Sequence, residues 1–265
     1  MHGATIKISN LPNKMNHFND INSFVDLYEH DHVNYFYCNI GGIKLAINLA
    51  KSCKLQNLPI VFFALDKESM VKMKGLCDIV DASNIGYDIY PDFLEYNTRE
   101  FNWICFAKYH IAKPILESGR TLTYLDTDIV ATDNFQADIL NELNKNEDHL
   151  LVQSSHGSSL CAGFFSLSPS FDQNIIDLFL DRGEKVLEQD DSNFHDQDLM
   201  RKLTRSSKVK FKLLDKDIYP NGAWYYKHSK RIESICKIIH FNCVKGEANK
   251  ISKYKKFGHW YIDDK

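Results

Sequence analysis

The sequence predicts an α/β fold whose mostly parallel sheet is covered by helices on both faces. Two observations carry this prediction. Short apolar runs of strand-forming residues alternate along the chain with segments whose apolar residues recur at helical spacing. Strands that are apolar throughout are typical of parallel sheets buried on both faces. The chain has 265 residues, 44% of them hydrophobic, so it is long enough for one large core.

The first half of the chain supplies the clearest alternation. Residues 33–38 are aromatic and β-branched and predict the first strand, which ends at Asn39 before two glycines. Apolar residues at helical spacing follow in residues 43–55, and Pro59 ends that helix. The other elements expected here are a weak helix at 21–28, strands at 60–65 and 77–80, and helices at 70–76 and 101–116, the last of them capped by Gly119.

The second half begins with an apolar strand over residues 121–130, which runs into two carboxylates. Further elements are predicted from the same patterns. They are strands at 150–153, 162–166, 210–214 and 235–240, and a helix at 175–187.

The composition excludes several classes of protein. Lys and Arg number 32 and Asp and Glu 35, so the net charge of −3 offers no basic excess for a nucleic-acid backbone. No apolar run is long enough for a transmembrane helix, and residues 1–10 lack the pattern of a signal peptide. The seven cysteines form no CxxC pair and stand mostly among apolar residues, which predicts free buried thiols and a cytoplasmic location.

The strongest local signal is the sequence Leu125-Asp126-Thr127-Asp128 at the end of an apolar strand. Successive side chains of a strand point to opposite faces, but both carboxylates can converge on one cation where the backbone turns. Oxygen ligands suit Mg²⁺ or Mn²⁺, and such ions commonly bridge the phosphates of a nucleotide. Ligands bind outside the carboxyl ends of parallel strands, where this motif is expected. The triplet alone also fits an acidic turn that ends a strand.

Several segments follow this motif in a fixed order. They are Cys161-Ala162-Gly163-Phe164-Phe165, Asp196-Gln197-Asp198, Tyr219-Pro220-Asn221-Gly222 and residues 240–260. In this order the chain resembles the nucleotide-diphospho-sugar glycosyltransferases of the GT-A fold, over about residues 35–260. The resemblance is strongest to the retaining families that contain glycogenin, the bacterial lipooligosaccharide galactosyltransferases and the plant cell-wall xylosyl- and arabinosyltransferases. It implies a Rossmann-like, mostly parallel sheet flanked by helices, with a smaller sheet on the acceptor side.

The resemblance implies a metal site and a diphosphate site. Asp126, Asp128 and His240 would hold Mn²⁺, or Mg²⁺, against the diphosphate of a UDP-sugar donor, and neutral imidazole suits Mn²⁺. A histidine satisfied by contacts at a strand end is the alternative for His240. Gly246 and Lys250 match a Gly and a Lys that contact the diphosphate, where the Lys neutralises charge on the leaving group. The wider spacing from His240 than in glycogenin leaves the neighbouring lysines as alternatives for Lys250.

The same resemblance assigns residues to the nucleoside and to the donor sugar. Asn39 would lie near the base or ribose, and Lys108 would reach the donor from the helix before the metal-binding strand. Ala162 and Gly163 would form a floor of small residues under the donor sugar. Turn chemistry explains Asn39 as well, extension of the ammonium to solvent explains Lys108, and close strand packing explains the small residues.

The resemblance places Asp196 and Gln197 at the reacting carbon. Asp196 would contact sugar hydroxyls and Gln197 would lie beside the anomeric carbon. The alternative for this acidic stretch, which comprises Asp190, Asp191, Asp196 and Asp198, is a solvated loop. Because an amide is a poor nucleophile, we expect a retaining transfer by same-face attack, with the departing phosphate as base and Gln197 stabilising the cation. Some aromatic rings in segments expected to be loops should line the acceptor cleft. These rings are Tyr87, Tyr90, Phe93, Tyr96, Trp224, Tyr225 and Tyr226.

We expect one GT-A domain over residues 1–265, because Asp128 and His240 are far apart in the sequence and must meet. Residues 33–130 would form the nucleotide-binding half, and residues 131–265 the acceptor-side half with the diphosphate-contacting tail. The acceptor would be a glycan, a glycoprotein or a small molecule.

Two alternatives remain open. One is a haloacid-dehalogenase-like phosphatase with Asp126 as nucleophile and Asp128 as acid. That family carries the motif on its first strand and adds a Gly-Asp-x-x-x-Asp motif, which this chain lacks. The other is a non-catalytic carbohydrate-binding module on the same fold, which would have no need of the metal ligands.

Overall fold

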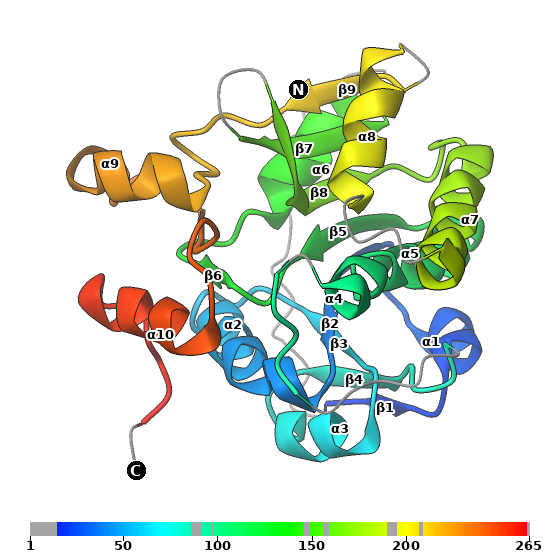
Figure 1. The fold of residues 1–265 in the computed structure, drawn as a ribbon, viewed down its shortest axis with the longest axis horizontal. Coiled ribbons are helices and arrows are strands. Elements are labelled where there is room, and N and C mark those ends of the chain that lie inside the picture. The colour runs from blue at the N-terminus through cyan, green and yellow to red at the C-terminus, as the bar shows by residue number, and fades with distance from the viewer. Residues whose placement is uncertain are drawn as a thin grey trace, which may run out of the picture.

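An eight-stranded sheet forms the centre of the computed structural model, which describes residues 15–85, 92–96, 98–145, 149–155, 159–189, 195–206 and 209–263. In spatial order its strands are β1 (His17–Phe18), β4 (Asp78–Asp81), β3 (Val61–Ala64), β2 (His32–Cys38), β5 (Thr121–Leu125), β8 (Leu160–Leu167), β7 (Leu150–Ser154) and β9 (Phe211–Leu213). Neighbours run parallel except where β8 pairs with β5 and β7. The prediction of a mostly parallel sheet is confirmed (Figure 1).

Helices cover both faces of this sheet (Figure 1). One face carries α1 (Ile21–Leu27), α4 (Arg99–Ile104), α5 (Ala107–Glu117), α7 (Gln173–Gln189) and α8 (Asp196–Arg205). The other carries α2 (Ile43–Leu55), α3 (Lys67–Met73) and α6 (Gln136–Lys145). Successive side chains of β2 point to opposite faces of the sheet. Val33 and Tyr35 therefore pack with the helices on the first face, and Phe36 packs with those on the other.

A smaller antiparallel sheet pairs β6 (Ile129–Ala131) with β10 (Ile238–His240). With α9 (Gly222–Ile232) and α10 (Glu247–Lys256) it encloses a third apolar cluster. The segment after α10 is fastened to α2, where Asn48 Nδ2 donates to the carbonyl of His259 (3.0 Å) and Asn48 Oδ1 accepts from the amide of Tyr261 (2.7 Å). These bonds hold α10 beside the amino-terminal half of the sheet.

The helix expected at 101–116 is divided into α4 and α5. The carbonyl of Ile104 at the end of α4 accepts a hydrogen bond from the hydroxyl of Tyr37 (2.7 Å), and Phe106 beside the break is fully buried. Helical periodicity continues across the break, which is why the sequence suggested one helix. The cap predicted at Gly119 is confirmed, with φ of +80° and the amide of Arg120 bonded to the carbonyl of Ile115.

The expectation that Trp224, Tyr225 and Tyr226 lie in a loop is wrong, because they belong to α9. Asn221 caps that helix by accepting from the amide of Trp224 (3.0 Å), and Tyr225 is fully buried. The basic tail likewise contains a regular helix, α10. Tyr87 and Tyr90, which were expected in a loop, lie outside the described residues.

All seven cysteines are free thiols, as the sequence predicts. Five are buried, namely Cys38, Cys53, Cys77, Cys161 and Cys236. Among the described residues, none of the helices combines the length and the apolar character needed to cross a lipid bilayer.

Polar side chains form a buried network across the middle strands. On β2, His32 Nε2 lies 3.0 Å from Asn34 Oδ1, and it lies 3.1 Å from Thr123 Oγ1 on β5. Thr123 Oγ1 is in turn 2.8 Å from Ser166 Oγ on β8. Burial lowers the pKa of His32 to about 4, so the folded protein keeps this imidazole neutral at neutral pH.

We expect acid to destabilise the protein through His32. The unfolded chain takes up this proton near pH 6.5 and the folded chain only near pH 4, so the contribution is complete above pH 6.5 and is lost as the pH falls towards 4. The loss amounts to about 3 kcal/mol in the free energy of unfolding. Urea titrations across this range measure it, and His32→Gln should flatten the pH dependence. Equal pH dependence in both proteins would contradict the assignment.

Candidate active site

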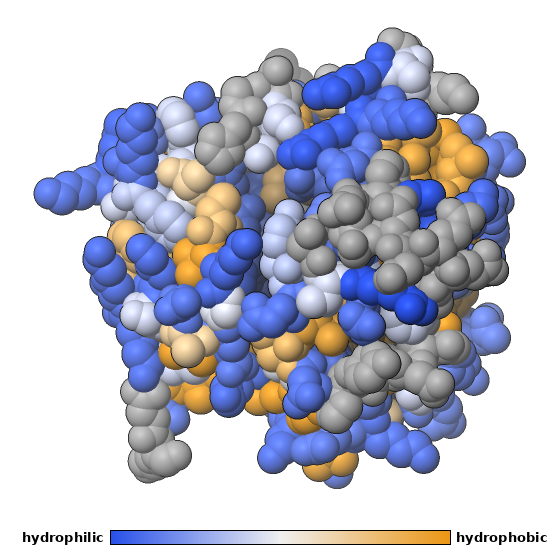
Figure 2. Space-filling model, in the orientation of Figure 1, coloured by the Kyte–Doolittle hydropathy of each residue, from blue (hydrophilic) through white to orange (hydrophobic). Residues whose placement is uncertain are grey.

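A cleft of about 600 Å³ opens at the carboxyl ends of β2 and β5 (Figure 2). The part of the fold that carries α9 and α10 lies on one side of it, and the part that carries α4 and α8 lies on the other (Figure 1). Eleven site residues inferred from the sequence line the cleft. They are Asn39, Lys108, Asp126, Asp128, Ala162, Gly163, Asp196, Gln197, His240, Gly246 and Lys250. The structure therefore brings together residues from both ends of the chain in one cleft.

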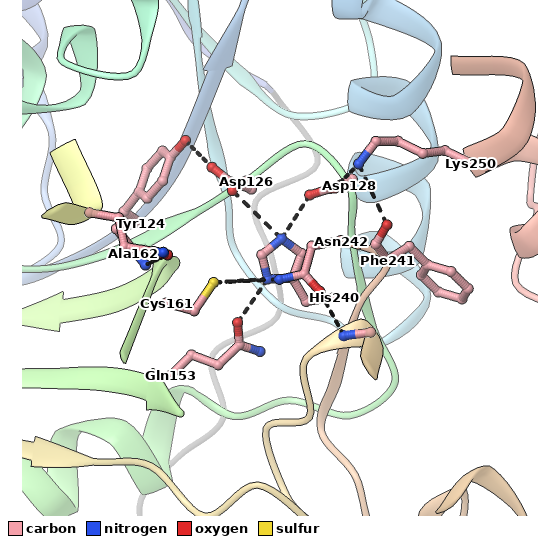
Figure 3. A network of polar contacts seen from close by, with 12 residues as sticks. Tyr124, Asp126, Asp128, Gln153, Cys161, Ala162, His240, Phe241, Asn242 and Lys250 are labelled. Carbon is pink, nitrogen blue, oxygen red and sulfur yellow. Dashed lines mark hydrogen bonds and ion pairs between the residues drawn. The ribbon is translucent and has the colours of Figure 1, made fainter. Parts of the chain in front are cut away.

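Three side chains in the cleft form a cluster that could hold a metal ion. One ligand atom each from Asp126, Asp128 and His240 lies within 4.8 Å of the other two. The chain turns between β5 and β6 at the two carboxylates, and β10 pairs with β6 so that His240 lies opposite Ile129. His240 Nε2 is 2.9 Å from Asp128 Oδ1 and 3.6 Å from Asp126 Oδ2 (Figure 3).

The donor atoms of this cluster fit a divalent cation such as Mn²⁺ or Mg²⁺. Two carboxylates and one imidazole are typical ligands of such ions. His240 Nε2 is fully buried and, despite the carboxylates nearby, makes no hydrogen bond with any described residue. Its other nitrogen, Nδ1, is 2.7 Å from Gln153 Oε1. This arrangement leaves Nε2 as the ligand atom that faces the carboxylates.

The electrostatics of the cluster keep Asp128 ionised. Burial alone would raise the pKa of Asp128, but Lys250 and His240 outweigh burial and lower it. Lys250 Nζ donates to Asp128 Oδ2, so the lysine of α10 reaches the cluster (Figure 3). Burial would likewise lower the pKa of His240, and the Asp128 carboxylate raises it instead. Lys250 and His240 therefore balance the negative charge of the Asp128 carboxylate in this structure.

A second buried ion pair lies deeper in the cleft. Lys108 Nζ is 3.0 Å from Asp196 Oδ2 and 4.0 Å from Asp126 Oδ1. Burial alone would lower the pKa of Lys108, but the two carboxylates outweigh it and raise the pKa, so the ammonium keeps its charge. Asp196 lies in the first turn of α8 and is 4% exposed, which places it in the core of the site. Asp190 and Asp191, its neighbours in the acidic stretch, lie outside the described residues.

Several contacts meet at the backbone of Ala162 and Gly163. Pairing between β7 and β8 shifts after Val152, so part of β8 bulges next to the cleft. The amide of Asp126 donates to the carbonyl of Gly163 (2.7 Å), and the amide of Ala162 donates to Gln197 Oε1 (3.1 Å). Lys108 Nζ donates to the carbonyl of Ala162 (3.3 Å). The bulge thus connects the turn that carries Asp126 and Asp128 with α5 and α8.

Two glycines at the site are required for different reasons. A Cβ at Gly163 would stand 2.3 Å from Asp126 Oδ2 and 2.4 Å from the Cε1 atom of His240, so only glycine leaves room for both ligands. Gly246 has φ of +79°, a left-handed conformation that favours glycine, and it precedes the first turn of the helix that carries Lys250.

Four residues of the site were missed by the sequence analysis. The hydroxyl of Tyr124 donates to Asp126 Oδ1 (2.6 Å), and Asn242 Nδ2 donates to the thiol of Cys161 (3.5 Å) beside His240. Gln153 bonds the histidine itself. Gln153 directly follows the apolar residues 150–152, and this position is the one sequence signal that indicates a buried polar side chain.

The fold and the site define a GT-A glycosyltransferase. A family model described as nucleotide-diphospho-sugar transferase matches residues 55–253. The chain belongs to this family, and not to the phosphatases that the Asp-x-Asp motif alone would also fit.

Comparison with known proteins agrees with this class. The chain is 25% identical over 282 residues to a UDP-galactose:fucoside alpha-3-galactosyltransferase of Dictyostelium discoideum, covering 86% of this chain and 42% of that protein. It therefore spans less than half the length of this curated relative. The fold is similar to that of galactosyltransferase LgtC, with a TM-score of 0.57 at 11% identity over 88% of this chain and 98% of that one. It is also similar to the glycosyltransferase GlyE of Streptococcus pneumoniae, with a TM-score of 0.55 at 18% identity over 87% and 60%.

Proposed function

We propose that this protein transfers a sugar from a UDP-sugar to an acceptor hydroxyl with the help of a divalent metal, and with retention at the anomeric carbon. The observation that carries the proposal is the cluster of Asp126, Asp128 and His240 at the end of β5, which faces the same cleft as the cations Lys108 and Lys250. The family of the chain supports the nucleotide-sugar donor, and the name of its Dictyostelium relative supports UDP.

The proposed site divides the work among these groups. A bound Mn²⁺ or Mg²⁺ supplies Lewis-acid stabilisation of the leaving diphosphate. Asp126, Asp128 and His240 would hold the ion. The charge of the ion would then balance the Asp128 carboxylate, as the ammonium of Lys250 does in this structure. Lys250, placed by Gly246 at the start of α10, would then neutralise charge on the diphosphate.

Asp196 and Gln197 are proposed to act on the donor sugar. Burial raises the pKa of the Asp196 carboxyl, and its ion pair with Lys108 offsets part of this effect in the buried end of the cleft. Gln197 Oε1 is held by the amide of Ala162, above the small side chains that would form the floor of the sugar pocket. Asn39, 4% exposed at the end of β2, is proposed to contact the base or ribose.

The remaining parts of the proposal concern the whole protein. We take residues 1–265 as one domain, with a nucleotide-binding half at 33–130 and an acceptor-side half at 131–265. The acceptor would be a glycan, a glycoprotein or a small molecule, and a fucoside is the first to test, given the name of the relative. The free thiols support a cytoplasmic location.

The direct test is hydrolysis and transfer with UDP-, GDP- and dTDP-sugars, each with Mn²⁺, with Mg²⁺ and with a chelator. We expect UDP release from one UDP-sugar that depends on the metal. Binding of UDP and Mn²⁺ without turnover of any donor would instead favour the non-catalytic carbohydrate-binding module.

A thiol provides a measure of binding that does not depend on turnover. Cys243 lines the cleft and is the exposed cysteine, whereas burial raises the pKa of the Cys38, Cys77 and Cys105 thiols and slows their alkylation. We expect iodoacetamide to modify Cys243 first, and UDP with Mn²⁺ to slow this reaction severalfold, as peptide mass spectrometry would show. Cys243→Ser is the control, and equal rates with and without UDP and Mn²⁺ would contradict the location of the site.

A further inference from the structure

The side chain of Gln153, on β7, is held in one orientation by backbone carbonyls. Its Nε2 lies 3.1 Å from the carbonyl oxygen of Tyr219 and 3.0 Å from that of Pro220. A carbonyl oxygen accepts hydrogen bonds but cannot donate them, so the atom facing both carbonyls must be the NH₂ group. Gln153 is fully buried, which leaves its Oε1 directed towards His240 (Figure 3).

The orientation of Gln153 determines which nitrogen of His240 is protonated. Oε1 can only accept, and it lies 2.7 Å from His240 Nδ1, so Nδ1 carries a proton. In the neutral imidazole the lone pair is then on Nε2, the atom that faces Asp126 and Asp128. Cys161 Sγ, at 3.8 Å, is the more distant neighbour of Nδ1.

The segment Tyr219-Pro220-Asn221-Gly222 completes this support. Asn221 Nδ2 donates to the carbonyl of Ser154, next to Gln153 on β7 (2.8 Å). The amide of Gly222 donates to Asn242 Oδ1 (2.8 Å), two residues after His240, and a Cβ at Gly222 would lie 2.4 Å from the carbonyl oxygen of Asn242. The segment therefore joins the end of β7 to the strand that carries the histidine.

We propose that Gln153 is a positioning residue for the metal site: it accepts the Nδ1 proton of His240 and thereby presents Nε2 to the cation. This inference rests on the proposed metal-dependent function, and it assigns a task to a residue outside the ligand cluster. Partners that orient a histidine ligand in this way typically contribute 10- to 100-fold to metal affinity.

The test measures Mn²⁺ binding to the full chain from the electron paramagnetic resonance signal of free Mn²⁺. Gln153→Met keeps the volume and removes the acceptor, and should weaken Mn²⁺ binding about 10- to 100-fold. Gln153→Glu keeps an oxygen acceptor for Nδ1 but loses the donors to Tyr219 and Pro220, so it should bind Mn²⁺ within a few-fold of the wild type while unfolding at a lower temperature.

The control is Asn34→Leu, which removes a buried amide from β2, away from the cleft lining. It should lower thermal stability without changing Mn²⁺ affinity. A merely structural role for Gln153 predicts equal losses of affinity for Gln153→Met and Gln153→Glu, and that result, or unchanged binding by Gln153→Met, would overturn the inference. A wild type that binds no Mn²⁺ would contradict the metal proposal itself.

Discussion

Replacing Asp128 with asparagine should lower the rate of UDP-sugar turnover roughly a hundred- to a thousandfold. The side chain keeps its shape but loses the charge that His240 Nε2 and Lys250 Nζ approach in the cluster. A neutral amide is a weak ligand for Mn²⁺, so the loss should appear both in metal binding and in turnover. Donor hydrolysis with Mn²⁺, measured alongside the paramagnetic resonance titration, separates the two.

Asp26→Asn on α1 is the matched control, because Asp26 is exposed and lies outside the cleft lining. It should leave both quantities unchanged. Asp126→Asn should resemble Asp128→Asn. Unchanged donor hydrolysis and transfer in both carboxylate variants would overturn the proposed function, whatever the donor sugar proves to be.

Adding one methyl group at Gly163 should nearly abolish metal binding and turnover, with an effect of at least a hundredfold. The new Cβ would stand 2.3 Å from Asp126 Oδ2 and 2.4 Å from the Cε1 atom of His240, so two of the three ligands must move apart. The backbone of Gly163 has little freedom to retreat, since its carbonyl accepts from the amide of Asp126. Mn²⁺ titration and UDP-sugar hydrolysis of Gly163→Ala measure the effect.

Gly75→Ala provides the opposite case. A Cβ there meets no atom within 4 Å, but φ is +83°, so the variant should lose about 1 to 2 kcal/mol of stability and keep full metal affinity. If Gly163→Ala lost stability in the same way and still bound Mn²⁺ like the wild type, the close approach at Gly163 would have no bearing on the metal site.

The sequence was informative wherever a signal is local. The apolar strand predicted over residues 121–130 and its two carboxylates can be recognised from a few neighbouring residues. The structure divides this strand into β5 and β6, because the chain turns at Asp126 and Asp128. The small sheet could be anticipated only through the resemblance, since β6 and β10 are three residues each and pair across most of the second half of the chain. The helices α6, α8 and α10 were missed because their polar faces conceal the short apolar stripe that contacts the core.

Contacts between distant residues account for the parts of the site that could not be predicted. The charge of Lys108 is balanced by Asp196, and nothing near Lys108 in the sequence indicates this. Gln153 acquires its orientation from carbonyls 66 and 67 positions away, so its role emerges only when β7 and the start of α9 are packed together. The bulge that places Gly163 beside Asp126 likewise depends on strand pairing rather than on any sequence motif.

The clasp between α2 and the segment after α10 bears on the order in which the protein becomes active during its synthesis. Asn48 and Tyr261 are 213 positions apart, and Lys250 and Asp128 are 122 apart. When β9 completes the central sheet, the ribosome has not yet added His240 and Lys250, the proposed third metal ligand and the proposed diphosphate-contacting lysine. Under the proposed function, the nascent protein therefore cannot use metal binding to guide the folding of its first half, and turnover has to wait until His240 and Lys250 have joined the cleft.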